Sequence, residues 1–190
     1  MTQFRARRKG GVQVEMPAHA AALIASLARQ LVELLSDGEA AKPVDDDPLE
    51  AMLEFDAPRE PPQDPALMRL LPNAHREDEE ASAEFRRFTE HNLRAGKIAD
   101  AMAVIEAIGD LDPDAADAED LEFELDADEA RSWLRSLTDM RLTLAERLGV
   151  TADDEAYWAS LTPDDPRLPV YEIYGWLSYV LESLLDAVNH

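Results

Sequence analysis

The sequence predicts an α+β fold that is predominantly helical, with helices packed around one central helix and a small three-stranded antiparallel sheet. Most of the chain carries apolar residues at the three- and four-residue spacing of amphipathic helices. Three short segments instead alternate apolar and polar residues, as half-buried strands do. With 190 residues the chain is long enough to bury a substantial core, and we expect a single domain over residues 1–190.

The segment from Leu121 to Gly149 predicts a strand followed by the central helix. Its first five residues alternate as a strand, and Asp126 with Glu129 three residues later form the pattern of a capping box. Gly149 ends the helix that follows. Because Leu142 points away from the main apolar stripe, we expect this helix to pack on two sides. The stripe consists of Ala130, Trp133, Leu134, Leu137, Met140, Leu144 and Leu148.

The N-terminal segment predicts a β-hairpin. Residues 4–8 and 12–16 can pair across Lys9-Gly10-Gly11, where the glycines allow a positive φ in a tight turn. A two-stranded hairpin is marginally stable by itself, so we expect the strand at 121–125 to be its third member.

Helical patterns fill most of the remaining sequence. Pro17 opens a helix that Asp37-Gly38 closes, and a short helix follows Asp64-Pro65. We expect two further helices at 79–93 and 95–109, a short helix after Thr151, and a last helix at 171–188. The predicted inward positions are Ala18, Ala22, Leu23, Leu27, Leu31, Leu34 and Leu35 in the first helix and Ile98, Met102, Ile105 and Ile108 in the segment before the strand.

Residues 39–63 change in composition to Pro, Asp, Glu and Ala, which predicts a flexible acidic insertion. Within it, Leu49, Met52, Leu53 and Phe55 form one apolar patch. The patch either folds onto the body as a helical turn or lies in a solvated loop. As a functional element, the segment would be a docking site for a partner.

The charge of the chain restricts its partners. Lys and Arg number 18 against 41 Asp and Glu, a formal net charge of −23. Duplex DNA would repel such a chain unless its few basic residues gathered on one face, so we expect at most weak DNA contact. This acidity suits a protein that docks on basic surfaces of other proteins. No apolar run approaches the length of a membrane span, and a secretory signal is missing, so we expect a cytoplasmic protein.

Nothing in the sequence indicates an enzyme, a metal site or a cofactor. The absence of cysteine excludes disulfides, thiolate nucleophiles and thiol redox switching. Asp110, Asp112 and Asp114 open like a calcium loop, but the glycine and the final carboxylate of that loop are replaced by Ala115 and Leu121. The four histidines are scattered, and Glu84 with His91 lacks the further ligands that zinc requires.

Candidate binding residues are of two kinds. Arg141 falls within an apolar arc, where it serves either as a buried ion pair between helices or as an anion site. Two basic clusters and three aromatic residues of the last helix, which point away from its core stripe, are the candidate contacts for a partner. The clusters are Arg5, Arg7, Arg8, Lys9 and Arg86, Arg87, Arg94, Lys97, which internal ion pairs explain equally well. The aromatic residues are Tyr171, Trp176 and Tyr179, which either form an interface or cover Leu142 and the second face of the central helix.

Three ordered blocks carry a family resemblance. They are FRRFTEHNLRAGKIADA at 85–101, DEARSWLRSLTDMRLTLAERLGVT at 128–151 and YEIYGWLSYVLESLLDAV at 171–188. Together with the N-terminal hairpin and residues 64–78, the sequence resembles an actinobacterial family of oxidative-stress regulators, the AosR-type family, first catalogued as a domain of unknown function. The resemblance implies a non-enzymatic transcriptional regulator that works with an alternative sigma factor and supports redox homeostasis. Paired-cysteine sensing does not carry over, because this chain has no cysteine.

Two hypotheses follow. The chain is either a transcriptional regulator that binds a sigma factor or another RNA polymerase component, or a cytoplasmic adaptor unrelated to transcription. We also expect a homodimer, with Tyr171, Trp176 and Tyr179 either in its interface or on the surface that a sigma factor meets.

Overall fold

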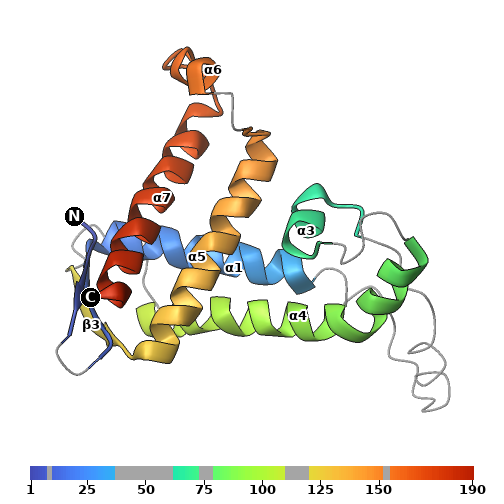
Figure 1. Ribbon diagram of the computed structural model, residues 1–190. Helices are drawn as coiled ribbons and strands as arrows, with labels where there is room; N and C mark the ends of the chain where they lie inside the picture. Colours follow the sequence, from blue (N-terminus) through green and yellow to red (C-terminus); the bar gives the residue numbers. More distant parts are fainter. Residues whose placement is uncertain (8–9, 37–61, 73–78, 110–119, 152–154) are drawn as a thin grey trace.

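A computed structural model describes residues 1–7, 10–36, 62–72, 79–109, 120–151 and 155–190, with the backbone alone for 79–88 and 155–156. Figure 1 shows α1 and α4 lying side by side, with α5 crossing them and rising beside α7 to α6. All but the last two residues of the predicted insertion at 39–63 lie outside the described part. The elements are β1 Gln3–Ala6, β2 Val12–Met16, α1 Ala18–Ser36, α3 Pro65–Leu70, α4 Glu79–Ile108, β3 Leu121–Leu125, α5 Ala127–Leu148, α6 Glu155–Ala159 and α7 Leu168–Asn189.

The predicted sheet is confirmed. Its strand order is β1-β2-β3 with both pairs antiparallel, and Val14 of the middle strand faces Phe4 on one side and Phe123 on the other. Gly10 and Gly11 have φ of +83° and +88°, as the predicted turn requires. The first strand ends two residues earlier than expected, at Ala6.

The predicted central helix is confirmed as α5. It contacts α1, α3, α4, α7 and β3, so it packs on more than one side. Asp126 accepts hydrogen bonds from the backbone N–H groups of Asp128 and Glu129, while Glu129 reaches back to the N–H of Asp126 and completes the capping box. Gly149 closes the helix in the left-handed conformation with φ +70°.

The core forms where α5 and α7 meet the sheet. Trp133 of α5 is fully buried, with its ring centroid 6.3 Å from that of Phe4 and 5.6 Å from that of Phe123. Leu177, Val180 and Leu184 of α7 are fully buried as well and complete this centre. Burying such side chains stabilises the fold by about 1.5–3 kcal/mol each.

Helix α1 differs from its prediction in two ways. Its buried side is formed largely by small residues, because the leucines at 23, 27 and 34 are only partly buried. The expectation that no apolar run reaches the length of a membrane span was wrong, since α1 is long and apolar enough by length and composition. Its buried side packs on α4, as that of a core helix does. The buried residues are Ala20, Ala21, Ala22, Ile24, Ala25, Ala28, Leu31 and Leu35.

Helix α4 corrects a second prediction. The two helices expected at 79–93 and 95–109 are one helix of 30 residues, which passes through Gly96 without a break. A glycine inside a helix costs only about 1 kcal/mol relative to alanine, and tertiary packing offsets that cost. Ala101 and Val104 line the buried side of α4, whereas Met102, predicted to point inward, is 46% exposed.

Candidate partner-binding surfaces

The far end of the α5–α7 pair carries a stack of aromatic rings. The ring of Tyr171 lies parallel to that of Trp158, with centroids 4.7 Å apart and planes 7° apart. The ring of Tyr174 also stacks with that of Tyr171, with centroids 6.1 Å apart. Because this stack joins α6 to α7, it fixes α6 on the end of the arm seen in Figure 1.

Arg167 extends the stack at the α6 end. Its guanidinium donates a 2.6 Å hydrogen bond to the hydroxyl of Tyr157 and lies 5.8 Å from the ring centre of Trp158. It also donates twice to Asp165, at 3.0 and 2.7 Å. These bonds, with that from the backbone N–H of Arg167, lower the pKa of Asp165 to about 2. The side-chain bonds to Asp165 and Tyr157 raise the pKa of Arg167. Tyr157 and Arg167 remain about half exposed, so both can meet a partner.

Arg141 lies at the other end of the stack. Its contacts differ from the buried ion pair predicted for it. Among the described residues no carboxylate pairs with it, and its side chain is only partly buried. Nε donates to the hydroxyl of Ser178 at 2.7 Å, a terminal nitrogen donates to the hydroxyl of Tyr174 at 3.0 Å, and the guanidinium lies 4.8 Å from the Tyr174 ring centre. An arginine that keeps contact with water and bonds two hydroxyls requires no counter-ion. It therefore joins α5 to α7 through neutral partners.

We call the set Arg167, Tyr157, Trp158, Tyr171, Tyr174 and Arg141 the aromatic–arginine column. Of the three aromatic residues predicted to bind a partner, only Tyr171 belongs to it. Trp176 is partly buried against the core, and Tyr179 is 41% exposed on another side of α7. The Tyr157-Trp158 pair, in the short helix expected after Thr151, was not among the binding residues predicted from the sequence. Adjacent aromatic residues beside a proline turn were the available signal.

The basic clusters are largely paired within the chain. Arg94 is 4% exposed, donates to Glu90 at 2.9 Å and to the carbonyl oxygen of Leu35 at 2.8 Å, and so holds the end of α1 against α4. On the hairpin, Arg5 donates to Glu15 at 2.7 Å, and Arg7 pairs with Glu124. Arg94, Arg5 and Arg7 therefore form ion pairs within the chain, the alternative to partner binding that the sequence left open. The side chains of Arg86 and Arg87 lie outside the described part, and their role stays a prediction.

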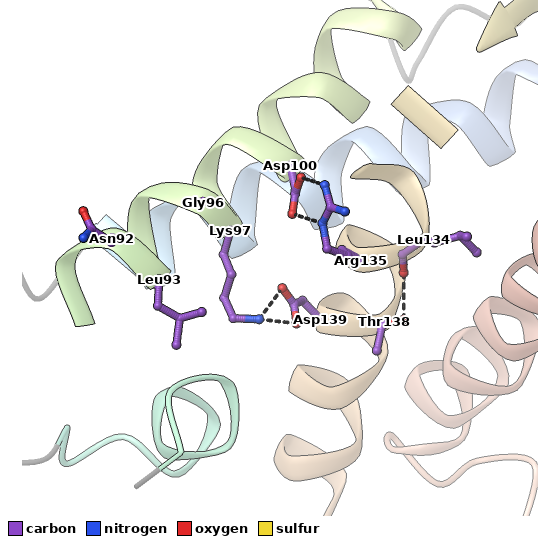
Figure 2. A pocket seen from close by; sticks show the side chains of 9 residues that line it. All are labelled: Asn92, Leu93, Gly96, Lys97, Asp100, Leu134, Arg135, Thr138 and Asp139. Atoms are coloured by element: carbon purple, nitrogen blue, oxygen red, sulfur yellow. Dashed lines mark hydrogen bonds and ion pairs between the residues drawn. The ribbon is translucent and has the colours of Figure 1, made fainter. Parts of the chain in front are cut away.

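Figure 2 shows a hollow between α4 and α5, with a volume of about 380 Å³. Two ion pairs cross it from helix to helix. Lys97 donates to both carboxylate oxygens of Asp139 at 2.7 and 2.8 Å, and Arg135 donates to both of those of Asp100 at 2.6 and 2.7 Å. The remaining lining residues are Asn92, Leu93, Gly96, Leu134 and Thr138.

The two ion pairs differ in burial. The side chains of Lys97 and Asp139 are 18% and 7% exposed, whereas that of Arg135 is 57% exposed. Burial raises the pKa of Asp139 although Lys97 opposes the change, and the hydrogen bonds that Arg135 donates to Asp100 raise the pKa of Arg135. All four charges are matched, so the hollow carries no net charge.

Among the described residues, no group of three or more His, Asp or Glu is placed to hold a metal ion. The side chain of Glu84 and the loop with Asp110, Asp112 and Asp114 fall outside that part.

The fold and these surfaces define a class: a predominantly helical α+β protein with a three-stranded antiparallel sheet and a column of aromatic and arginine side chains at one end of the α5–α7 pair. The chain belongs to the family described as Domain of unknown function (DUF2017), whose model matches residues 1–188. Proteins named Oxidative stress regulator AosR, from Mycobacterium bovis (strain ATCC BAA-935 / AF2122/97) and Mycobacterium tuberculosis (strain ATCC 25618 / H37Rv), are each 28% identical over 178 residues. Each match covers 88% of this chain and 77% of the relative.

A Mycobacterium leprae (strain TN) relative is 25% identical over 185 residues, covering 90% of this chain and 79% of its own length. No solved structure matches the chain.

Proposed function

We propose that this protein is a non-enzymatic transcriptional regulator of the oxidative-stress response. The observation that carries the proposal is the match over 88% of the chain to relatives named as oxidative-stress regulators. The chain has no cysteine, so its regulatory role does not depend on a thiol switch.

The regulator acts through a protein partner, a sigma factor or another RNA polymerase component. A net charge of −23 favours basic surfaces on such a partner and disfavours the DNA backbone. The aromatic–arginine column is the docking surface, because Tyr, Trp and Arg carry most of the binding energy at protein interfaces. Tyr157 and Arg167 are the contacts, since both are about half exposed and already held in place by their mutual hydrogen bond.

Affinity purification of the full chain followed by mass spectrometry tests this proposal. We expect a sigma factor or RNA polymerase subunits with the wild-type protein, and at least tenfold less of them with Tyr157→Ala or Arg167→Ala. Arg131→Ala is the matched control, because Arg131 is 58% exposed and, among the described residues, its ion pair is with its neighbour Asp128 on the first turns of α5. Capture of a partner outside transcription would instead favour the adaptor hypothesis, and an undiminished yield from both variants would remove the column as the docking surface.

A further inference from the structure

The sheet ends in two edge strands, β1 and β3, and its apolar side is incompletely covered at β3. Val12 and Val14 of the middle strand are 1% and 0% exposed, and Phe4 of β1, the strand that α7 contacts, is 8% exposed. Leu121 and Phe123 of β3 pack on the same core but stay partly exposed. The apolar side of the sheet therefore continues to the β3 edge, where the described part of the chain does not close it.

The backbone of β3 has groups that point out of the sheet. The carbonyl oxygen of Leu125 would lie 2.5 Å from a Cβ atom at Gly11, so it points toward β2. Backbone N–H and C=O groups alternate sides along an antiparallel strand, so those of Glu122 and Glu124 point away from β2. Among the described residues, no other strand pairs with this side of β3. An edge of this kind is a template for a further strand.

The polar side of the sheet carries three carboxylates and leaves one of them without a cation. Arg5 pairs with Glu15, and Arg7 pairs with Glu124. Glu122 forms no ion pair with any described residue, and it lies directly opposite Glu15 across the β2–β3 ladder. Like charges in opposite positions destabilise a sheet, so a cation beside Glu122 would be stabilising.

We propose that β3 is a docking edge for an extended segment of a partner protein, in which apolar residues alternate with lysine or arginine. The backbone of that segment pairs with the outward groups of Glu122 and Glu124 as a fourth strand. Because side chains alternate across a strand, its apolar residues lie beside Leu121 and Phe123 while its cations lie beside Glu122. Backbone pairing, apolar contact and charge all select the same alternating pattern.

A second copy of this chain fits the edge less well than a basic segment does. Two β3 strands side by side would bring Glu122 and Glu124 of one copy against the same carboxylates of the other. The net charge of −23 repels a second copy and attracts a basic segment. The docking edge is independent of the transcriptional role and of the aromatic–arginine column, because Figure 1 shows the sheet at the end of the α5–α7 pair opposite to α6.

Amide hydrogen exchange of the full chain, followed by NMR, tests the proposal with an alternating Lys-Val heptapeptide as the probe. A heptapeptide of the same composition, with its lysines and valines in two separate blocks, is the matched control. In the free chain the amides of Glu122 and Glu124 should exchange rapidly, because they point to solvent. The alternating peptide should slow both amides by about tenfold or more, and the block peptide should leave them unchanged.

Fluorescence anisotropy of the labelled peptide measures the contributions to affinity. Glu122→Lys should weaken binding about tenfold, because it places a cation against the lysines of the peptide. Glu33→Lys makes the same change of charge at an exposed position of α1 and should weaken binding less than about twofold. Glu122→Pro removes the outward N–H group but not the ladder to β2, and it should weaken binding about tenfold as well.

Slow exchange of both amides in the free chain would show that the edge is already paired, by the chain itself or by a second copy, and would overturn the proposal. Equal binding of the alternating and block peptides, or equal affinity of wild type and Glu122→Lys, would show attraction by net charge alone and would overturn it too.

Discussion

Replacing Lys97 by methionine should destabilise the fold more than any other change at the hollow. The substitution keeps the length of the side chain but removes the only cation that bonds the Asp139 carboxylate among the described residues. That carboxylate is 7% exposed, so the substitution leaves a largely buried charge without its cation.

The expected loss is about 3 kcal/mol at pH 7. Breaking a buried ion pair by removing one partner costs about 3–5 kcal/mol, and the 18% exposure of Lys97 places this pair at the lower end. Arg135→Met is the internal comparison, since it breaks an ion pair of similar geometry across the same hollow. The Arg135 side chain is 57% exposed, but the Asp100 carboxylate that it leaves is 13% exposed, so its loss should cost about 1–2 kcal/mol, less than the loss of Lys97.

The pH dependence of the loss distinguishes an unpaired carboxylate from lost packing. Burial already raises the folded-state pKa of Asp139 above 3.8, and removal of Lys97 raises it further. A group with a raised folded-state pKa contributes stability that is present below its unfolded pKa and is lost as the pH rises through the folded pKa. The destabilisation of Lys97→Met should therefore shrink on acidification toward pH 3.8 and grow as the pH rises.

Urea unfolding of Lys97→Met and of the double variant Lys97→Met/Asp139→Asn, followed across pH, measures this effect. The double variant lacks the titrating group, so the difference between the two free energies of unfolding isolates Asp139 from the other carboxylates. A loss below about 1 kcal/mol at pH 7, or a difference that does not change with pH, would refute the reasoning.

Three further predictions can be checked by the same urea unfolding. Gly11→Ala should cost about 3 kcal/mol or more, because its Cβ would lie 2.5 Å from a backbone oxygen of β3. Gly10→Ala has free space around its Cβ and should cost about 1–2 kcal/mol for its positive φ alone. Equal losses of stability in the two variants would contradict the contact at Gly11. Arg94→Met should cost about 3–5 kcal/mol by leaving Glu90 buried and unpaired, and a loss typical of a surface arginine would count against this. Arg141→Leu should cost about 1 kcal/mol and Arg141→Ala about 2 kcal/mol, because leucine keeps the packing between α5 and α7. A larger loss of stability for the leucine variant than for the alanine variant would show that Arg141 does not act through packing.

The local sequence determined the elements whose signals lie within a few residues. The capping box at Asp126, the left-handed stop at Gly149 and the turn at Gly10-Gly11 depend on backbone groups of near neighbours, and each was predicted correctly. The alternation at 121–125 also identified the third strand, because a hairpin needs another strand to bury its apolar side.

Only the tertiary structure decided how the helices continue and what their charged residues meet. Gly96 did not end α4, since packing along the helix outweighs a local cost of about 1 kcal/mol. Arg94 became buried and Met102 exposed because α1 covers one side of α4 and leaves the other open, which no spacing within α4 reveals. The partner of Lys97 lies 42 residues away along the chain, and the two partners of Arg141 lie 37 and 33 residues away. Such pairs exist only once the helices have packed.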